Sequence, residues 1–126
     1  MVELSIAIAV LLLAVLTAFE VQLASQRLVR TSRETNLAMG DLSAAMEELL
    51  LMPKDDIPVA GSPFELDQPI ADFNELHLND EAIVPSYPGY VLGGDVPDPL
   101  EIVLTVTWTD HAGRARRLQL SSMKTR

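Results

Sequence analysis

The first part of the chain is one long apolar run. Between positions 4 and 19 only two residues are polar, and the first 24 residues carry just two charges, Glu3 and Glu20. A helix needs about 20 mostly apolar residues to cross a bilayer. Residues 1–24 are therefore predicted to form a transmembrane helix segment. Its predicted anchor residues are Leu4, Ile6, Ile8, Val10, Leu11, Leu12, Leu13, Val15, Leu16 and Phe19.

A cleaved secretory signal is the main alternative for such a start. Signals have a basic first region, a short apolar core and a small-residue cleavage site. No Lys or Arg precedes this run, and the helical pattern continues past Phe19 through Val21, Leu23 and Ala24. The pattern favours an anchor that remains part of the protein.

Glu3 stands at the start of the anchor. A charge within the hydrocarbon region costs about 2.5 kcal/mol or more, so such residues usually have a partner. In the other interpretation, Glu3 lies at the membrane interface beside the chain's own α-amino group. Spacing alone leaves both interpretations open.

The helical pattern extends to Pro53. No Gly occurs before Gly40 and no Pro before Pro53, so residues 3–52 are predicted to form a single helix that ends at the proline. Residues 25–52 are its amphipathic continuation. The apolar stripe contains Val21, Ala24, Leu28, Thr31, Thr35, Ala38, Leu42, Ala45, Leu49 and Met52, and the polar face contains Arg27, Arg30, Arg33, Glu34, Asp41 and Glu47.

The apolar stripe has two interpretations. A coiled coil would need a seam richer in Ile and Leu. We favour a helix whose last third, residues 38–52, packs against a small sheet. Residues 53–99 are dense in Pro and Gly and are predicted to be loops with short extended pieces at 75–78 and 90–92.

Residues 100–124 give the clearest strand pattern, a β-hairpin. Leu100, Ile102, Leu104, Val106 and Trp108 alternate with more polar residues, and a turn at 110–113 leads to Leu118 and Leu120. A three-residue loop with Gly113 in the left-handed position pairs Val106 with Leu118 and Leu104 with Leu120. The predicted contacts between helix and sheet are made by Leu42, Leu49, Met52, Leu104, Val106, Trp108, Leu118 and Leu120.

Composition narrows the possible functions. The 126 residues allow one small domain, and the net charge of −9 argues against binding to nucleic acid. Eleven acidic residues and no Lys or Arg occur between positions 55 and 101, whereas four basic residues follow Arg114. The chain has no Cys, so no disulfide staples the fold.

No catalytic, cofactor-binding or metal-binding residue is predicted, and the chain is not expected to be an enzyme. His111 lies in the predicted turn and is expected to be solvated. His77 has acidic neighbours in the sequence, but they lack the spacing of a metal site or of a calcium-binding loop. We therefore expect a solvated acidic surface there rather than a calcium site. Trp108 is interpreted as a core residue rather than a ligand platform.

The start of the chain, MVELSIAIAVL, resembles the N-terminal region of type IV pilins and type II secretion pseudopilins. In these families a leader ending in glycine precedes an apolar segment with one glutamate near its start. Glu3 matches that glutamate, although it stands two residues too early. The region from Val103 to Leu120, with Trp108, Asp110 and Gly113, is similar to the last hairpin of minor pilins and minor pseudopilins.

The resemblance implies an α+β, pilin-like fold, in which the C-terminal part of a long helix packs against a small antiparallel sheet. It implies a structural, minor subunit of a type IV pilus or a type II secretion pseudopilus. A prepilin peptidase would remove the leader and methylate the new N-terminus. The subunit would wait in the inner membrane, with its C-terminal region in the periplasm. An inner-membrane assembly platform would then move it into a filament, where Glu3 would neutralise a neighbouring subunit's terminal amine.

The sequence departs from the family pattern in two ways. The simplest account of the early Glu3 is that Met1 is an internal methionine preceded by a leader and two further residues. Arg27, Arg30 and Arg33 follow the apolar run, and the positive-inside rule alone would place them in the cytoplasm. The alternative function is a single-pass, membrane-anchored periplasmic or extracellular binding or scaffold module. A membrane-bound enzyme has the least support.

Overall fold

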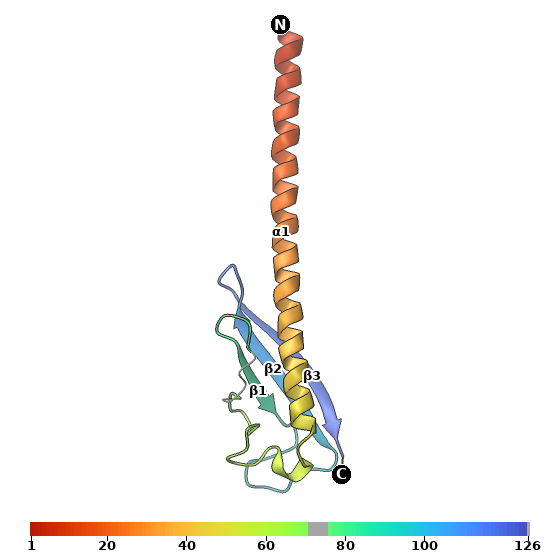
Figure 1. Cartoon of the computed structure of the whole chain (residues 1–126), viewed down its shortest axis with the longest axis vertical. Coiled ribbons are helices and arrows are strands. Elements are labelled where there is room, and N and C mark those ends of the chain that lie inside the picture. Colours follow the sequence, from red (N-terminus) through yellow and green to blue (C-terminus); the bar gives the residue numbers. More distant parts are fainter. Residues whose placement is uncertain (71–75, 126) are drawn as a thin grey trace. The chain divides into compact units, whose positions relative to one another are not determined.

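The computed structural model describes residues 1–70 and 76–125 of the chain. It contains a long helix α1 (Val2–Leu50), a short 3-10 helix η1 (Lys54–Asp56) and three strands, β1 (Ala82–Ser86), β2 (Leu100–Thr109) and β3 (Ala115–Lys124) (Figure 1). The chain forms two compact units, Met1–Arg33 and Glu34–Arg126. Each unit is described by itself below.

The first unit is helix alone. Its polar side chains near the apolar residues bond to the helix itself: the Ser5 hydroxyl donates to the Met1 carbonyl, and the Thr17 hydroxyl lies 3.1 Å from the Leu13 carbonyl and 2.9 Å from the Ala14 carbonyl. Such bonds satisfy a hydroxyl where water is absent. The apolar run therefore presents few unsatisfied polar groups to its surroundings.

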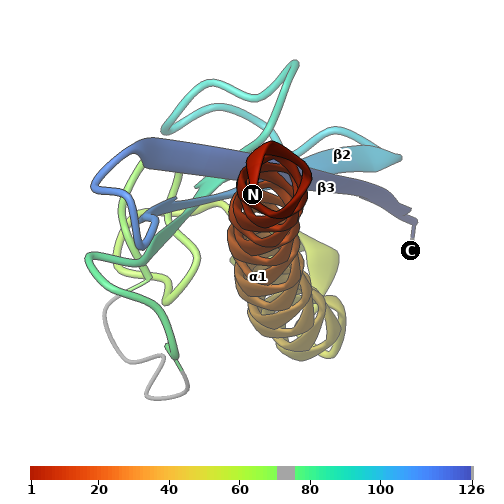
Figure 2. The same cartoon turned by 90° about the horizontal axis from the view of Figure 1, so that it is seen from above.

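The second unit has an α+β layout with two layers. The strands form one antiparallel sheet in the order β1-β2-β3. The C-terminal part of α1, drawn in yellow, packs against one face of this sheet (Figures 1 and 2). The predicted combination of a long N-terminal helix and a small antiparallel sheet is therefore confirmed.

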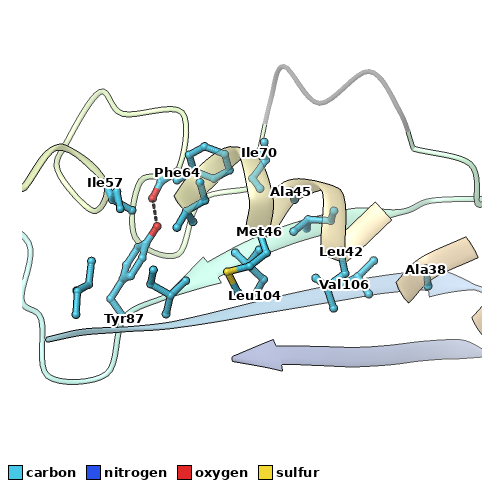
Figure 3. Close-up of a cluster of buried hydrophobic side chains, with 14 of the residues drawn as sticks. Ala38, Leu42, Ala45, Met46, Ile57, Phe64, Ile70, Tyr87, Leu104 and Val106 are labelled. Carbon is cyan, nitrogen blue, oxygen red and sulfur yellow. Dashed lines mark hydrogen bonds between the residues drawn. The ribbon is translucent and has the colours of Figure 1, made fainter. Parts of the chain in front are cut away.

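The core lies between the helix and the sheet. Residues at helical spacing on α1 meet alternate residues of β2, because each element buries one face. Loop residues close one end of the core (Figure 3). The buried apolar side chains are Ala38, Leu42, Ala45, Met46, Leu49, Ile57, Phe64, Ile70, Ile83, Tyr87, Tyr90, Leu100, Ile102, Leu104, Val106 and Trp108.

The C-terminal hairpin has the predicted register. Leu104 pairs with Leu120 and Val106 with Leu118. The Gly113 amide donates to the Asp110 carbonyl at 2.9 Å, and Gly113 has φ of +77°. This is the predicted turn with a left-handed glycine, which avoids the Cβ clash that other residues would have there.

The two short extended pieces predicted in the loop region are not strands of the sheet, although a short strand does occur within residues 53–99. Residues 76–78 and 90–92 are not strands, and Glu75 lies outside the described residues. The observed strand is β1, which contains Pro85 and was missed for that reason. The carbonyls of Ile83 and Pro85 point away from β2 and accept from the amides of Ile70 and Asp67, each at 3.0 Å. Pro85 therefore stands at an edge position, where its missing amide costs no bond to β2.

Helix α1 ends two residues earlier than predicted, at Leu50 rather than Met52. The Leu51 amide bonds to the Glu48 carbonyl and the Met52 amide to the Leu49 carbonyl, so the last turn tightens before Pro53. The predicted polar face also needs correction, because Asp41 is buried beside the core.

Candidate functional site

The anchor residues form an exposed apolar surface. All ten predicted anchor side chains, from Leu4 to Phe19, are between 50% and 65% exposed. Glu3 is also exposed and is the one acidic residue in the first turn of α1. An uninterrupted apolar surface of this length is unusual for a helix in water and marks a surface that something else covers.

Helix α1 is the candidate membrane span among the described residues. Its most apolar window is long and apolar enough to cross a bilayer, and none of that window is buried. A buried core helix and an N-terminal signal sequence would pass the same test of length and composition, but no residue of this window is buried in the chain. This N-terminal helix is therefore suited to a membrane, and neither of its ends is assigned to a side of the membrane.

Asp41 links the helix to the loop before β1. Its Oδ1 lies 2.7 Å from Nδ1 of His77, and its Oδ2 accepts from the His77 amide at 3.3 Å. The Asp41 side chain is almost fully buried, whereas that of His77 is about half exposed. His77 therefore compensates a buried carboxylate that would otherwise be costly.

Glu81 joins the same cluster. Its Oε2 accepts from the His77 amide at 3.1 Å. Partial burial, followed by the hydrogen bond to Asp41 and the negative charge of Asp41, raises the pKa of Glu81 from 4.5 to about 7. A carboxyl with this pKa keeps its proton in mildly acidic solution, beside the Asp41 carboxylate. The pair thereby avoids two adjacent negative charges.

Glu34 links the helix to the hairpin turn. Its Oε1 accepts from the His111 amide at 3.1 Å and lies 3.4 Å from Nδ1 of His111. His111 is an exposed turn residue, as predicted, but its side chain is only 18% exposed because it lies against Glu34. Glu34 and Asp41 are seven residues apart, about two turns, so they lie on the same flank of α1. Both histidines of the chain thus hold loops against this flank.

Asp110 stabilises the turn itself. Its Oδ1 accepts from the amides of Ala112 and Arg114, and its Oδ2 accepts from the Arg116 side chain at 2.9 Å. The hydrogen bond from the Arg114 amide, with those from Arg116 and Ala112, holds the pKa of Asp110 below its ordinary value against the opposing effect of burial. Asp110 therefore has a structural role that its turn position explains.

The residues predicted to pack between helix and sheet differ in how deeply they are buried. Leu42, Leu49, Leu104, Val106 and Trp108 are in the core, while Met52, Leu118 and Leu120 are partly buried against it. β3 is one of the two edge strands of the sheet, and its residues alternate between exposed and partly buried. The indole Nε1 of Trp108 is buried with no hydrogen-bond partner among the described residues.

The described residues contain no group of three His, Cys, Asp or Glu side chains arranged to hold a metal ion. Asp72, Asn74 and Glu75, which are near His77 in the sequence, lie outside the described residues. The acid and histidine contacts of Asp41, Glu81 and Glu34 bind loops to the helix. These contacts therefore have a structural role in the observed fold.

Comparisons of the chain with protein-family models, with curated proteins and with solved structures found no match. Any functional conclusion therefore depends on the residues and geometry of this chain. Two functional contacts were missed from the sequence, those of Asp41 and Glu34. The available signal was their position beside the stripe, since Glu34, Ala38, Asp41 and Ala45 follow helical spacing.

Proposed function

We propose that this protein is a structural subunit of a membrane-derived filament of the type IV pilin or pseudopilin kind. The observation that carries the proposal is the exposed apolar part of α1, which continues without a break into a small α+β unit. In this proposal, lipid covers the apolar helix before assembly and helices of neighbouring subunits cover it afterwards. The C-terminal unit lies on the periplasmic side.

Glu3 is the residue on which assembly depends in this proposal. It is exposed in the first turn of α1, directly before the apolar run. A carboxylate among packed helices requires a cationic partner, and the terminal amine of a neighbouring subunit has the right charge. Glu3 would thus set the axial register between subunits.

One side of the apolar helix supports close packing between helices. Ala14, Thr17, Ala18 and Ser25 line a shallow depression on α1 together with Val21 and Gln22. Small side chains allow neighbouring helices in a membrane to approach each other closely. The same side would allow close packing in a filament core.

The second candidate is an anchored binding module, and β3 favours it. β3 is a ten-residue edge strand with only β2 as its neighbour in the described sheet. An open edge of this length can accept an extended segment of a partner. In that case the apolar helix would serve as an anchor only, and Glu3 would have no role in assembly.

The two candidates are separated by Glu3→Ala in the full chain, expressed together with its assembly machinery. We expect the variant to insert in the membrane normally and to be lost from sheared filaments. Glu20→Ala is the matched control, because Glu20 is an exposed acid on the same helix. Membrane extraction and filament fractions of both variants would be compared by immunoblot. Normal incorporation of Glu3→Ala would contradict the proposed role of Glu3 and favour the anchored module.

A further inference from the structure

One face of α1 just beyond the apolar run is basic and has no ion-pair partner among residues 1–70 and 76–125. Arg27, Arg30 and Arg33 are exposed, and none forms an ion pair within the described residues. No acidic residue stands between Glu20 and Glu34. The helical spacing puts Leu23 on the same face as Arg27 and Arg30. We call Leu23, Gln26, Arg27, Arg30 and Arg33 the arginine face.

The loops of the C-terminal unit carry the opposite charge. The ammonium group of Lys54, on η1, donates to the carbonyls of Val96 at 3.3 Å and Pro97 at 3.1 Å, so η1 lies beside the segment that leads into β2. These two segments expose several acidic side chains, and a neighbouring turn exposes apolar ones. We call this set the loop surface: Asp56, Val91, Leu92, Asp95 and Asp98.

The apolar part of the loop surface is unusual for a loop. The Gly94 amide donates to the Val91 carbonyl at 2.9 Å and closes a turn. Val91 is 76% exposed and Leu92 is 49% exposed at this turn. Lys54 is buried and its ammonium group pairs with Asp55 at 3.1 Å, whereas Asp56, Asp95 and Asp98 form no ion pair within the described residues. The loop surface thus combines exposed apolar side chains with unneutralised acids.

We propose that the arginine face of one copy binds the loop surface of a second copy of this chain. The inference rests on the proposed filament function and adds a specific subunit contact to it. The argument for a second copy is charge complementarity: each copy carries one basic and one acidic surface, and each surface also has exposed apolar side chains. Complementary surfaces steer encounter and exclude contacts between like surfaces.

The contact joins two different surfaces, so it leaves one of each free on every pair of copies. Repetition of such a contact produces an open polymer rather than a closed dimer. The same contact gives Arg27, Arg30 and Arg33 anionic partners outside the cytoplasm. This removes the conflict between their charge and a periplasmic location of the C-terminal unit.

The test uses thiol cross-linking of the full chain solubilised in a zwitterionic detergent. Residue 26 and the end of α1 are about 36 Å apart along the helix, so two copies held at the same depth of a bilayer could not bring the two surfaces together. The chain has no cysteine, so an engineered thiol has only the engineered thiol of another copy as its partner. Gln26→Cys chains are mixed with Val91→Cys chains and oxidised. Ser25→Cys is the matched control, because Ser25 is exposed at nearly the same depth but lies about 100° around the helix. We expect about fivefold more cross-linked dimer from position 26 than from position 25.

Charge variants then test the electrostatic part. Asp56→Lys with Asp95→Lys on the Val91→Cys chain should lower the yield to that of the Ser25 control. Adding Arg27→Glu and Arg30→Glu to the Gln26→Cys chain should restore the yield with the lysine variant, since the opposite charges are exchanged. High salt should weaken the native contact by screening. Unchanged Trp108 fluorescence would verify that the loop variants keep the fold.

Three outcomes would overturn the inference. These are equal yields at positions 25 and 26, yields insensitive to the aspartate variants, and an effect of the arginine variants that appears only with anionic lipid. The last outcome would assign the arginines to lipid headgroups. Because the assay contains no filaments, its failure leaves the Glu3 test intact, and failure of the Glu3 test leaves this contact open to the same assay.

Discussion

Helix α1 is one continuous element with two different surroundings. In the first unit its leucines are exposed, for example Leu12 at 59%, whereas in the second unit Leu42 is completely buried. The residue type and the backbone conformation are the same in both places. What differs is whether the chain itself supplies the apolar partner. In the second unit the partner is the sheet, whereas in the first unit the described residues supply none, and the proposed function assigns that place to lipid or another subunit.

The difference in leucine exposure shows that the two parts of α1 contribute differently to stability. Burial of a leucine side chain stabilises a fold by roughly 1.5–3 kcal/mol only where the fold provides the covering surface. The second unit can therefore be stable by itself. Under the proposed function, the first unit would gain the equivalent stabilisation on insertion into a membrane or on assembly.

The largest expected contrast is between Leu42→Ala and Leu12→Ala. Leu42→Ala should lower the free energy of unfolding of the C-terminal unit by about 2–5 kcal/mol, because it leaves a cavity between α1 and β2. Leu12→Ala should leave it unchanged. Denaturation of the full chain in detergent micelles, followed by fluorescence of the single Trp108, measures both. Equal effects would contradict the division into independently stabilised parts.

A second contrast concerns acids. The pKa of Glu81 is raised from 4.5 to about 7, so between these values the folded chain holds a proton that the unfolded chain has lost. The free energy of unfolding must therefore fall as the pH rises through this range. A fully buried carboxyl would lose about 3 kcal/mol, and partial exposure reduces this to about 1–2 kcal/mol. Denaturation midpoints between pH 4 and pH 8 measure the loss.

At acidic pH the free energy of unfolding changes in the opposite direction and falls as the pH is lowered. The pKa of Asp110 lies below its ordinary value of 3.8, so its contribution is present above that pH and is lost as the pH falls through the folded pKa. Glu81→Gln should remove the fall between pH 4.5 and 7 and keep the acid loss. Glu20→Gln, in the first unit, should keep both. A persistent fall in Glu81→Gln would show that another group is responsible.

The smallest contrast is between two glycines with opposite expected signs. Gly113→Ala should destabilise the second unit by about 1 kcal/mol, because φ of +77° is unfavourable for alanine. Gly40→Ala should stabilise it by about 0.5–1 kcal/mol, because Gly40 is inside α1 and an added Cβ meets no atom within 4 Å. Thermal midpoints of the two variants provide the measurement. If both variants shifted the thermal midpoint in the same direction, the hairpin turn or the helix would have to be strained at another position.

Much of the fold followed from local patterns. The hairpin register could be predicted because alternation and the position of Gly113 independently favoured one pairing. The helix could be predicted from its apolar run, its amphipathic continuation and the absence of Pro before Pro53. β1 could not, because Pro85 is a strand breaker unless its amide position faces away from the neighbouring strand. In the structure, the side of β1 that faces away from β2 accepts hydrogen bonds from the amides of Ile70 and Asp67. These two residues are far from β2 in the sequence, so a local pattern does not reveal the arrangement.

The candidate sites divide in the same way. Glu3, the anchor residues and the arginine face are visible in the sequence, because they depend on composition and helical spacing within one element. The contacts of Asp41 with His77 and of Glu34 with His111 are not, since their partners are 36 and 77 residues away. The loop surface likewise exists only because Lys54 brings η1 beside residues 96–97.

The long helix, its apolar first part and the hairpin follow from the local sequence, because each depends on periodicity or on turn chemistry within a short stretch of chain. The covered side of α1, the partners of the buried acids and the loops that meet beyond the end of the helix depend on contacts between distant residues. The physical reason is that burial and pairing of charges are properties of surfaces, and folding assembles those surfaces from residues far apart in the chain.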